Sequence, residues 1–302
     1  MNEPTPETST PNMRVAPHPK ISLVITTRNR RSELDRFLSH LDQQTYRDFE
    51  ALVIDQNAGE GVSDILSRRS FRVQYFQMGQ QGAARGRNLG LEVAQGDILA
   101  IPDDDCWYPP DLLAGITAWF DANPEIDLLC TMERNERGEP MVPRGPVTAG
   151  FCTREAIGWR KPRSAWIAQS SMVFMRKRVC DRLGLLNPSI GVGADTPYQS
   201  GEETDYFLRA LESGFEMWYE PSIHVFHPEL RTQQRLFRTV YPYSLGMGYT
   251  LRLHRYSLFS VMGILCRALG GAATSAARAQ FAMAFAYLRR AQGIINGYFR
   301  LM

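Results

Sequence analysis

Residues 96–105 are Gly-Asp-Ile-Leu-Ala-Ile-Pro-Asp-Asp-Asp, a short apolar run followed by three carboxylates. The apolar part, residues 98–101, has the length and composition of a buried strand. Three carboxylates at the end of such a strand are costly unless a cation neutralises them. In an open α/β sheet, the carboxyl ends of the strands are also where ligands bind. The stretch therefore predicts a divalent-cation site that receives a diphosphate, and the alternative is a solvated acidic turn.

Strand-like and helix-like segments alternate from residue 21 to residue 226. Four apolar residues between 34 and 41 are spaced as the core-facing stripe of a helix, whose start Ser32 and Asp35 are expected to cap. The predicted strands are 21–25, 49–54, 71–76, 98–101, 126–131, 172–175, 215–219 and 223–226, and the further predicted helices are 63–69, 83–94, 109–123, 176–183 and 202–213. This alternation predicts an α/β fold with a doubly wound, largely parallel sheet flanked by helices.

The composition changes after residue 230. Residues 231–302 contain ten of the 34 basic residues, all of them arginines, and none of the 32 acidic ones, although the whole chain carries a net charge of only +2. An acidic body with a basic extension suggests two surfaces with different partners. The extension is expected to be helical, with breaks at Pro242, Gly246 and the pair Gly270-Gly271.

The chain is expected to have three parts: a disordered tail rich in Pro and Thr over 1–19, an α/β domain over 20–230, and a basic helical extension over 231–302. The tail lacks the apolar core of a signal peptide. No charge-free run in the extension approaches the roughly 20 residues of a membrane-spanning helix. Five cysteines without a CxxC pair are typical of a reduced protein. We expect a cytoplasmic protein, with peripheral attachment to the cytoplasmic face of the membrane left open.

Arginines recur every eleven residues in the extension, at Arg267, Arg278, Arg289 and Arg300. Eleven residues are almost three helical turns, so the four guanidinium groups would lie along one line. Such a helix suits contact with an anionic membrane. The alternative is a helical subdomain that packs on the core with its arginines solvated. No nucleic-acid-binding motif accompanies them, which disfavours DNA or RNA as a partner.

The first predicted strand ends in Thr-Thr-Arg-Asn-Arg at residues 26–30, without a glycine-rich loop. Neither GxGxxG nor GK[ST] is present there, which disfavours a Rossmann dehydrogenase and a P-loop NTPase. Gly82, Gly86 and Gly90 lie four residues apart on a predicted helix. That spacing fits close packing of the helix better than a phosphate-binding loop.

Polar side chains follow three of the predicted strands: Thr26 with Arg28, then Asp55, then residues 103–105. Because the ends of parallel strands converge, these side chains are expected to share one ligand crevice. An Asp can accept a hydrogen bond from a pyrimidine or from ribose hydroxyls, and an Arg can stack on a base or pair with phosphate. A single strand-end Asp is usually a helix cap, but three converging positions favour the crevice.

A second acidic group lies in the segment Gly-Glu-Glu-Thr-Asp at residues 201–205. Glu202, Glu203 and Asp205 are at the start of a predicted helix, where carboxylates are ordinary. The functional interpretation is a carboxylate that points into the crevice as a general base. His227, which follows an apolar strand, could complete a metal site with oxygen and nitrogen ligands, although a lone His is more often structural.

Taken together, these segments resemble the family 2 glycosyltransferases of the GT-A fold. The matching segments, which occur in the family's order and approximate spacing, are 21–30, 43–46, 49–55, 82–90, 96–105, 201–209 and 221–227. The resemblance implies that 20–230 is a GT-A catalytic domain. It also implies a nucleotide-sugar donor and a carbohydrate or lipid-linked acceptor as partners.

The resemblance also implies roles for single residues. The donor would contact Thr26, Arg28, Asp55, Arg87, Asp103 and Asp104. Asp103, Asp105 and His227 would hold Mg²⁺ or Mn²⁺. The catalytic base would come from the second acidic group and falls on Glu203, with Asp205 and Glu202 as substitutes.

The implied function is metal-dependent, inverting transfer of a sugar from a nucleotide-sugar donor to a hydroxyl acceptor during polysaccharide or glycolipid synthesis. UDP is favoured as the nucleotide because Asp55 and Arg28 suit a uracil base. Two alternatives stay open. A nucleotidyltransferase of similar sheet topology would carry a Gly/Arg/Lys-rich phosphate loop after the first strand. A non-catalytic nucleotide-sugar-binding module would bind the donor without turnover.

Overall fold

The computed structural model describes residues 18–59, 61–141, 148–154, 169–229 and 233–299, so most of the predicted tail over 1–19 lies outside it. The strands are β1 (Ile21–Thr27), β2 (Phe49–Asp55), β3 (Arg72–Gln77), β4 (Ile98–Ala100), β5 (Leu128–Arg134), β6 (Gly150–Phe151), β7 (Val173–Arg176) and β8 (Met217–Phe226). The helices are α1 (Arg31–Asp42), α2 (Ser63–Leu66), α3 (Ala83–Val93), α4 (Leu112–Ala122), α6 (Lys177–Leu183), α7 (Glu202–Glu212), α8 (Gln233–Leu253), α9 (Leu258–Ala277) and α10 (Phe281–Phe299).

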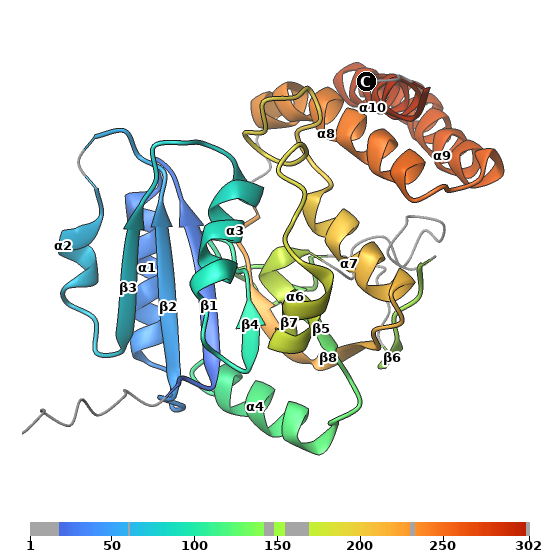
Figure 1. Ribbon diagram of the computed structural model, residues 1–302. Coiled ribbons are helices and arrows are strands. Elements are labelled where there is room, and N and C mark those ends of the chain that lie inside the picture. Colours follow the sequence, from blue (N-terminus) through green and yellow to red (C-terminus); the bar gives the residue numbers. More distant parts are fainter. Residues whose placement is uncertain (1–17, 60, 142–147, 155–168, 230–232, 300–302) are drawn as a thin grey trace, which may run out of the picture.

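The described strands form one sheet in the order β3-β2-β1-β4-β7-β5-β8-β6, with helices on its faces (Figure 1). The pairs β1–β2, β2–β3, β1–β4 and β5–β8 are parallel, whereas β4–β7, β5–β7 and β6–β8 are antiparallel. The predicted α/β class with a mostly parallel sheet is confirmed. Helices α8, α9 and α10 lie together beyond the end of the sheet to which β1, β2 and β3 point (Figure 1).

The predicted apolar stripe of helix α1 is confirmed, but its predicted cap is not formed. The buried residues of α1 are Leu34, Phe37, Leu38 and Leu41. The helix begins at Arg31, two residues earlier than a cap at Ser32 would place its start, and Arg30 precedes it without a capping side-chain hydrogen bond. The hydroxyl of Ser32 donates instead to Glu33, and Asp35 forms an ion pair with Arg69. Charged partners therefore replaced the expected capping box.

Helix α3 packs closely on β1 through its glycines, as predicted. A Cβ atom added at Gly90 would lie 2.2 Å from Cγ1 of Val24, and one at Gly86 would lie 2.7 Å from Cγ2 of Thr26. Side chains at these positions would push α3 off the sheet. The glycines thus bring the start of α3 beside the end of β1.

Strand β8 joins two segments that the sequence suggested were separate. It runs through Pro221, and its register with β5 is irregular between Thr131 and Met132, which pair with Glu220 and His224. The extra residues in β8 accommodate Pro221 there, since Pro is confined to edges and bulges of sheets. His227 directly follows the last residue of β8 and therefore lies at the end of the sheet.

The predicted breaks in the C-terminal helices are wrong. Helix α8 continues through Pro242 and Gly246, and α9 continues through Gly270 and Gly271. Several glycines in α8 and α10 are contact points: an added Cβ would lie 2.3 Å from the Ser200 carbonyl oxygen at Gly246 and 2.0 Å from the Leu245 carbonyl oxygen at Gly297. We call α8, α9 and α10 the helical bundle.

The helical bundle shares the hydrophobic core of the sheet. Leu251 of α8, Val261 and Ile264 of α9 and Ile294 of α10 belong to the same buried cluster as the strands. The bundle therefore packs on the α/β body. That residue 230 separates two domains remains a prediction.

The predicted single line of arginines is not formed. Arg267 lies in α9, Arg278 follows that helix, and Arg289 lies in α10, after a turn in which Ala279 has a φ of +57°. Arg300 lies outside the described residues. Within the described chain, α9 has the length and composition to cross a membrane, which is weak evidence by itself, and 39% of its apolar window is buried in the molecule.

Candidate active site

A cleft of about 750 Å³ lies between the strand ends and the helical bundle. One wall, which we call the strand-end wall, is formed by the ends of β1 and β4, the starts of α3 and α7, and His227. The other, which we call the bundle wall, is formed by α8 and α10. The residues of the strand-end wall include Thr26, Arg28, Arg30, Arg87, Asp103, Asp104, Asp105, Glu202, Glu203 and His227, and those of the bundle wall are Leu236, Thr239, Val240, Tyr243, Ser244, Met247 and Arg290.

Asp104 fixes the acidic loop to the end of β1. Its carboxylate accepts hydrogen bonds from Oγ1 of Thr27 at 2.8 Å and from Nη1 of Arg30 at 2.9 Å. Burial raises the pKa of Asp104 to about 6, while Arg30 and Thr27 oppose the shift. Asp104 thus anchors the loop rather than facing a ligand with free oxygens.

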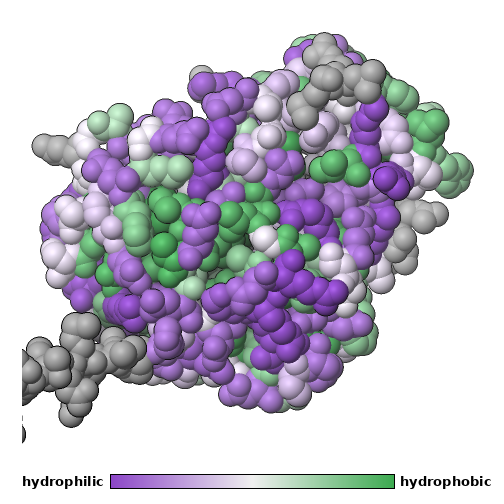
Figure 2. Space-filling model, in the orientation of Figure 1, coloured by the Kyte–Doolittle hydropathy of each residue, from purple (hydrophilic) through white to green (hydrophobic). Residues whose placement is uncertain are grey.

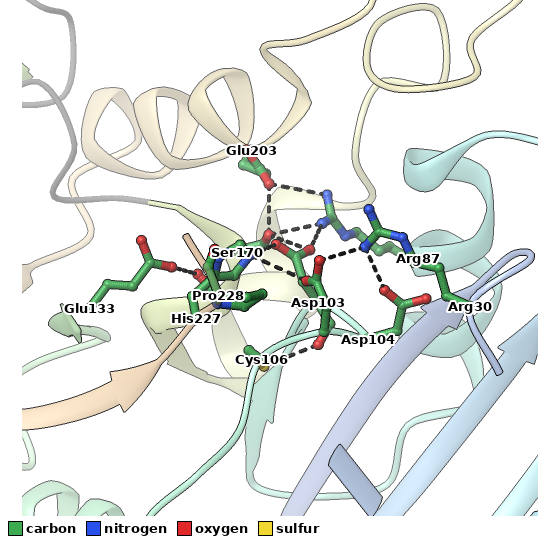
Figure 3. Close-up of polar contacts among 12 residues, drawn as sticks. Arg30, Arg87, Asp103, Asp104, Cys106, Glu133, Ser170, Glu203, His227 and Pro228 are labelled. Atoms are coloured by element: carbon green, nitrogen blue, oxygen red, sulfur yellow. Dashed lines mark hydrogen bonds and ion pairs between the residues drawn. The ribbon is translucent and has the colours of Figure 1, made fainter. Parts of the chain in front are cut away.

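Asp103, Asp105 and His227 form a cluster with the geometry of a cation site. Figure 3 shows two of them, Asp103 and His227, near each other. One ligand atom from each lies within 4.8 Å of the others. Nε2 of His227 is 3.2 Å from Oδ1 of Asp105 and 3.9 Å from Oδ2 of Asp103. The other carboxylate oxygen of Asp105 accepts from Arg30 at 2.7 Å.

The imidazole of His227 is oriented by the backbone. Its Nδ1 lies 3.0 Å from the carbonyl oxygen of Pro228, so Nδ1 carries a proton and Nε2 faces the two aspartates. Burial disfavours the charged ring, but the Asp105 hydrogen bond and the charges of Glu133 and Asp103 outweigh it and raise the pKa of His227 to about 9. Burial also raises the pKa of Glu133, which accepts a hydrogen bond from Ser171.

Arg87 holds the acidic groups of the strand-end wall together. The side chain is buried, and Nη2 donates to Oδ1 of Asp103 at 2.9 Å and to Oγ of Ser170 at 2.8 Å. Nη1 lies 3.1 Å from Glu202 and 3.4 Å from Glu203. Burial opposes its charge, but the three carboxylates keep the pKa of Arg87 above its ordinary value. Arg87 lines the cleft, with both terminal nitrogens paired within the protein.

The three candidate bases have different surroundings. Glu203 lines the cleft, and its Oε1 accepts from Oγ of Ser170 at 2.6 Å. Glu202 is buried, and burial together with the Glu203 charge raises its pKa to about 7. Asp205 is not among the lining residues, because it faces the helical bundle and contacts Nε2 of His254 at 3.1 Å and Nε of Arg209 at 3.0 Å.

His254 lies between α7 and the end of α8. Its Nδ1 is 3.0 Å from Oε2 of Glu212, so both ring nitrogens contact carboxylates of α7. The His254 side chain is only 3% exposed. Helix α7, which carries Glu203, is therefore attached both to Arg87 and to the bundle.

The predicted donor residues are only partly brought together. Thr26 and Arg28 line the cleft. Asp55 is not among the lining residues, since it is buried and accepts from the Asn57 side chain at 2.6 Å and from the Tyr75 hydroxyl at 3.0 Å. Its neighbour Gln56 lines the cleft instead.

Sequence reasoning did not assign roles to Arg30, Ser170, Glu133 and Arg290. Arg30 was visible at the end of the first predicted strand, where an arginine near three carboxylates is a signal for pairing. Ser170 and Glu133 lie far from the acidic loop in sequence, in segments with no motif. Arg290 was one of ten arginines in the extension, and nothing in the sequence distinguishes it.

The comparisons with known proteins agree with this geometry. The family model for "Glycosyl transferase family 2" matches residues 22–184, which is more than half of the chain. The chain belongs to glycosyl transferase family 2. The resemblance inferred from the acidic loop and its neighbouring segments is thereby confirmed, and the matched segment ends before α7.

Two curated relatives illustrate the family. An uncharacterized glycosyltransferase of Haemophilus influenzae is 27% identical over 195 residues, which are 64% of this chain and 62% of that protein. A Campylobacter jejuni protein named GalNAc(5)-diNAcBac-PP-undecaprenol beta-1,3-glucosyltransferase is 30% identical over 102 residues, 32% of this chain and 32% of that protein. The chain thus spans less than two thirds of the length of these relatives.

Solved structures extend the likeness to the whole fold. A mannosyltransferase from Pyrobaculum calidifontis, in complex with GDP-Man and Mn²⁺, has a TM-score of 0.59 at 17% identity, with 92% of this chain and 87% of that one covered. Residues 1–349 of Staphylococcus aureus TarS in complex with UDP give a TM-score of 0.57 at 13% identity, with 92% and 90% covered. The GT-A fold predicted from the sequence is confirmed.

Proposed function

We propose that this protein is a metal-dependent inverting glycosyltransferase that moves a sugar from a nucleotide donor to a hydroxyl acceptor. The observation that carries the proposal is a hydroxyl shared by two acidic groups. Oγ of Ser170 lies 2.6 Å from Glu203 and 3.2 Å from Asp103, so the proposed base and the proposed metal site face one cleft. Residues 20–230 would perform the transfer, and residues 231–302 would supply the second wall.

The donor would lie along the strand-end wall. Thr26, Arg28 and Gln56 line that side of the cleft, where the nucleotide would be held. UDP is the favoured nucleotide because Arg28, which lines the cleft, suits a uracil base, and the TarS complex with UDP supports it, whereas Asp55, the other residue expected to contact the base, does not line the cleft. The mannosyltransferase with GDP-Man is the competing precedent, so a donor panel has to include GDP-sugars.

The residues of the Asp103, Asp105 and His227 cluster fit Mg²⁺ or Mn²⁺. Oδ1 of Asp105 is buried and faces Nε2 of His227 at 3.2 Å, with no other close polar partner within the described chain. Carboxylate oxygens with one imidazole nitrogen suit such ions. When bound, the ion would stabilise the negative charge of the leaving diphosphate.

Glu203 would act as the general base on the acceptor hydroxyl. Its carboxylate is held by Ser170 and Arg87, which fix the oxygen that receives the proton. As the acceptor oxygen bonds to the anomeric carbon, the C–O bond to the diphosphate breaks with positive charge developing on the sugar. Attack from the face opposite the leaving group inverts the anomeric configuration.

We further propose that the protein works at an anionic membrane in the cytoplasm, in polysaccharide or glycolipid synthesis. Exposed apolar side chains gather on the outer faces of two helices, and Figure 2 shows apolar surface at that edge of the bundle, at the upper right. They are Phe259, Met262 and Leu269 on α9, and Phe281, Phe285, Leu288 and Phe299 on α10. The excess of arginine in residues 231–302 complements anionic lipid. Liposome flotation tests this proposal: we expect the protein to float with anionic liposomes but not with neutral ones. Failure to bind either kind of liposome at any salt concentration would contradict it.

A nucleotide-sugar panel tests the proposed function itself. We expect Mn²⁺- or Mg²⁺-dependent turnover of one donor, with inversion visible by NMR of the product. Donor binding without turnover would support the binding-module alternative. Release of pyrophosphate from a nucleoside triphosphate would support the nucleotidyltransferase alternative. Membership of the glycosyltransferase family disfavours that alternative.

A further inference from the structure

Arg290 of α10 is a cation of the bundle wall, and none of the described residues forms an ion pair with it. Its side chain is partly buried and lines the cleft. Within the described residues, the Arg290 guanidinium makes no hydrogen bond and no ion pair, whereas Arg87 on the strand-end wall contacts three carboxylates. The two arginines line the same cleft, but only Arg87 is paired with carboxylates of the described chain.

The electrostatic surroundings of Arg290 increase this imbalance. Burial lowers its pKa, the positive charge of Arg267 on α9 lowers it further, and only Tyr287 acts in the other direction. A desolvated cation beside a second cation is unfavourable unless an anion enters. A phosphate is the anion that a guanidinium pairs with best, because its oxygens match the planar donors.

The wall around Arg290 combines apolar side chains with the hydroxyl groups of Thr239, Tyr243 and Ser244. Leu236, Val240 and Met247 of α8 line the same side of the cleft and present hydrocarbon to it. Apolar side chains beside a single arginine match a ligand that carries a hydrocarbon chain next to a phosphate. A free sugar has neither a phosphate nor a hydrocarbon chain, so it would leave Arg290 and the apolar side chains unmatched.

We propose that Arg290 and the apolar residues of α8 form a subsite for the phosphate of a lipid-linked acceptor. The proposal rests on the proposed function, since it assigns the second substrate of the same cleft. The donor diphosphate would be bound at the strand-end wall, where the carboxylate and imidazole cluster lies. The bundle wall would hold the acceptor phosphate and the beginning of its chain.

The subsite is tested by measuring the binding of farnesyl diphosphate to the full chain by calorimetry, with no donor present. Arg290→Gln is expected to weaken binding about tenfold to hundredfold, the range for a hydrogen bond to a charged group. Arg290→Lys is expected to retain part of the affinity. The control is Arg289→Gln on the adjacent position: Arg289 donates to Gln292 and stacks on Tyr241, so its loss is expected to leave binding unchanged.

Two comparison ligands identify what the subsite recognises. Farnesol is expected not to bind, and inorganic pyrophosphate is expected to bind more weakly than farnesyl diphosphate, because it lacks the chain. Equal affinity of pyrophosphate and farnesyl diphosphate would show a site for free phosphate and overturn the lipid assignment. Unchanged farnesyl diphosphate binding in Arg290→Gln would overturn the role of Arg290.

Donor binding separates this proposal from the proposed function. UDP-sugar binding with Mn²⁺ is expected to be the same in wild type, Arg290→Gln and Arg289→Gln. If Arg290→Gln weakens donor binding instead, the arginine belongs to the donor site and the proposal is wrong. Farnesyl diphosphate binding needs no turnover, so a chain that transfers no sugar would refute the proposed function while leaving the subsite measurable.

Discussion

The two walls of the cleft differ in how they treat their buried and partly buried arginines. On the strand-end wall, Arg30 and Arg87 are paired with Asp103, Asp104 and Asp105, while the exposed Arg28 has no ion pair among the described residues. On the bundle wall, Arg290 has no such partner in the described part of the chain. The difference indicates that the first wall is built to keep its shape, whereas the second leaves a charge for a ligand to neutralise.

Replacing Glu203 tests whether the strand-end wall performs chemistry. Glu203→Gln keeps the contact with Ser170 but removes the proton acceptor, so kcat is expected to fall about 10²- to 10⁴-fold. The dissociation constant of the donor with Mn²⁺, measured by calorimetry, is expected to change by less than about twofold. A parallel loss of donor affinity would mean that Glu203 holds the donor and that another group is the base.

Removing Arg87 tests whether that wall depends on pairing. Arg87→Leu leaves Glu202, Glu203 and Asp103 without their cation, so the free energy of unfolding is expected to fall by about 3–5 kcal/mol in urea denaturation. The loss is expected to shrink below pH 7, because Glu202, with a pKa of about 7, becomes neutral there.

Arg85→Gln on the same helix is the matched control for Arg87→Leu. Arg85 pairs with Asp195, whose side chain is 77% exposed, and such surface pairs contribute about 0–1 kcal/mol. Equal destabilisation by both substitutions would contradict a special role for Arg87. Arg290→Gln removes a charge that has no ion pair among the described residues, so it is expected to leave the free energy of unfolding unchanged or to raise it.

The pH dependence of metal binding tests the cluster at His227. Because its pKa is about 9, the imidazole is protonated at neutral pH and must lose a proton before Nε2 can bind a cation. The Mn²⁺ dissociation constant is therefore expected to fall up to about tenfold per pH unit as the pH rises from about 6.5 to about 8.5. His227→Ala is expected to bind more weakly and to lose this slope. A pH-independent wild-type affinity would show that His227 is not a ligand.

The glycines of the helical bundle give the smallest predicted effect. At Gly297 an added Cβ would lie 2.0 Å from a backbone oxygen, so Gly297→Ala is expected to cost about 1–3 kcal/mol of unfolding free energy. At Gly270 the added Cβ meets nothing within 4 Å, so Gly270→Ala is expected to stabilise by about 0.4–1 kcal/mol. Thermal unfolding of the two variants distinguishes a packed bundle from a loose one, in which both would behave alike.

Local patterns predicted the strand-end wall well. The apolar runs that became β1, β2 and β4, and the acidic loop after β4, are contiguous in sequence, and their ends meet because parallel strands converge. The spacing of Gly86 and Gly90 predicted the packing of α3 on β1. These features depend on short-range periodicity, which a single sequence contains.

Long-range features were predicted less well. Gly246 and Gly271 were taken as helix breaks, because a sequence does not reveal that Ser200 and Tyr287, which lie far away along the chain, pack against them. Asp55 and Asp205 were assigned to the crevice from their positions, but their carboxylates contact Tyr75 and His254 instead. Packing of the helical extension on the core was one of two alternatives, but its role as a wall of the cleft was not predicted, since nothing in the sequence distinguishes Arg290 from the other arginines.

The double attachment of α7 has a consequence for building chimeras within this family. The helix that bears Glu203 is joined to Arg87 on one side and to His254 on the other, while the family-matched segment stops at residue 184. Grafting that segment alone onto another scaffold would transplant the acidic loop without the carboxylate that completes it. Residues 201–302 therefore form the natural unit of exchange, because α7 and the helices that brace it would travel together.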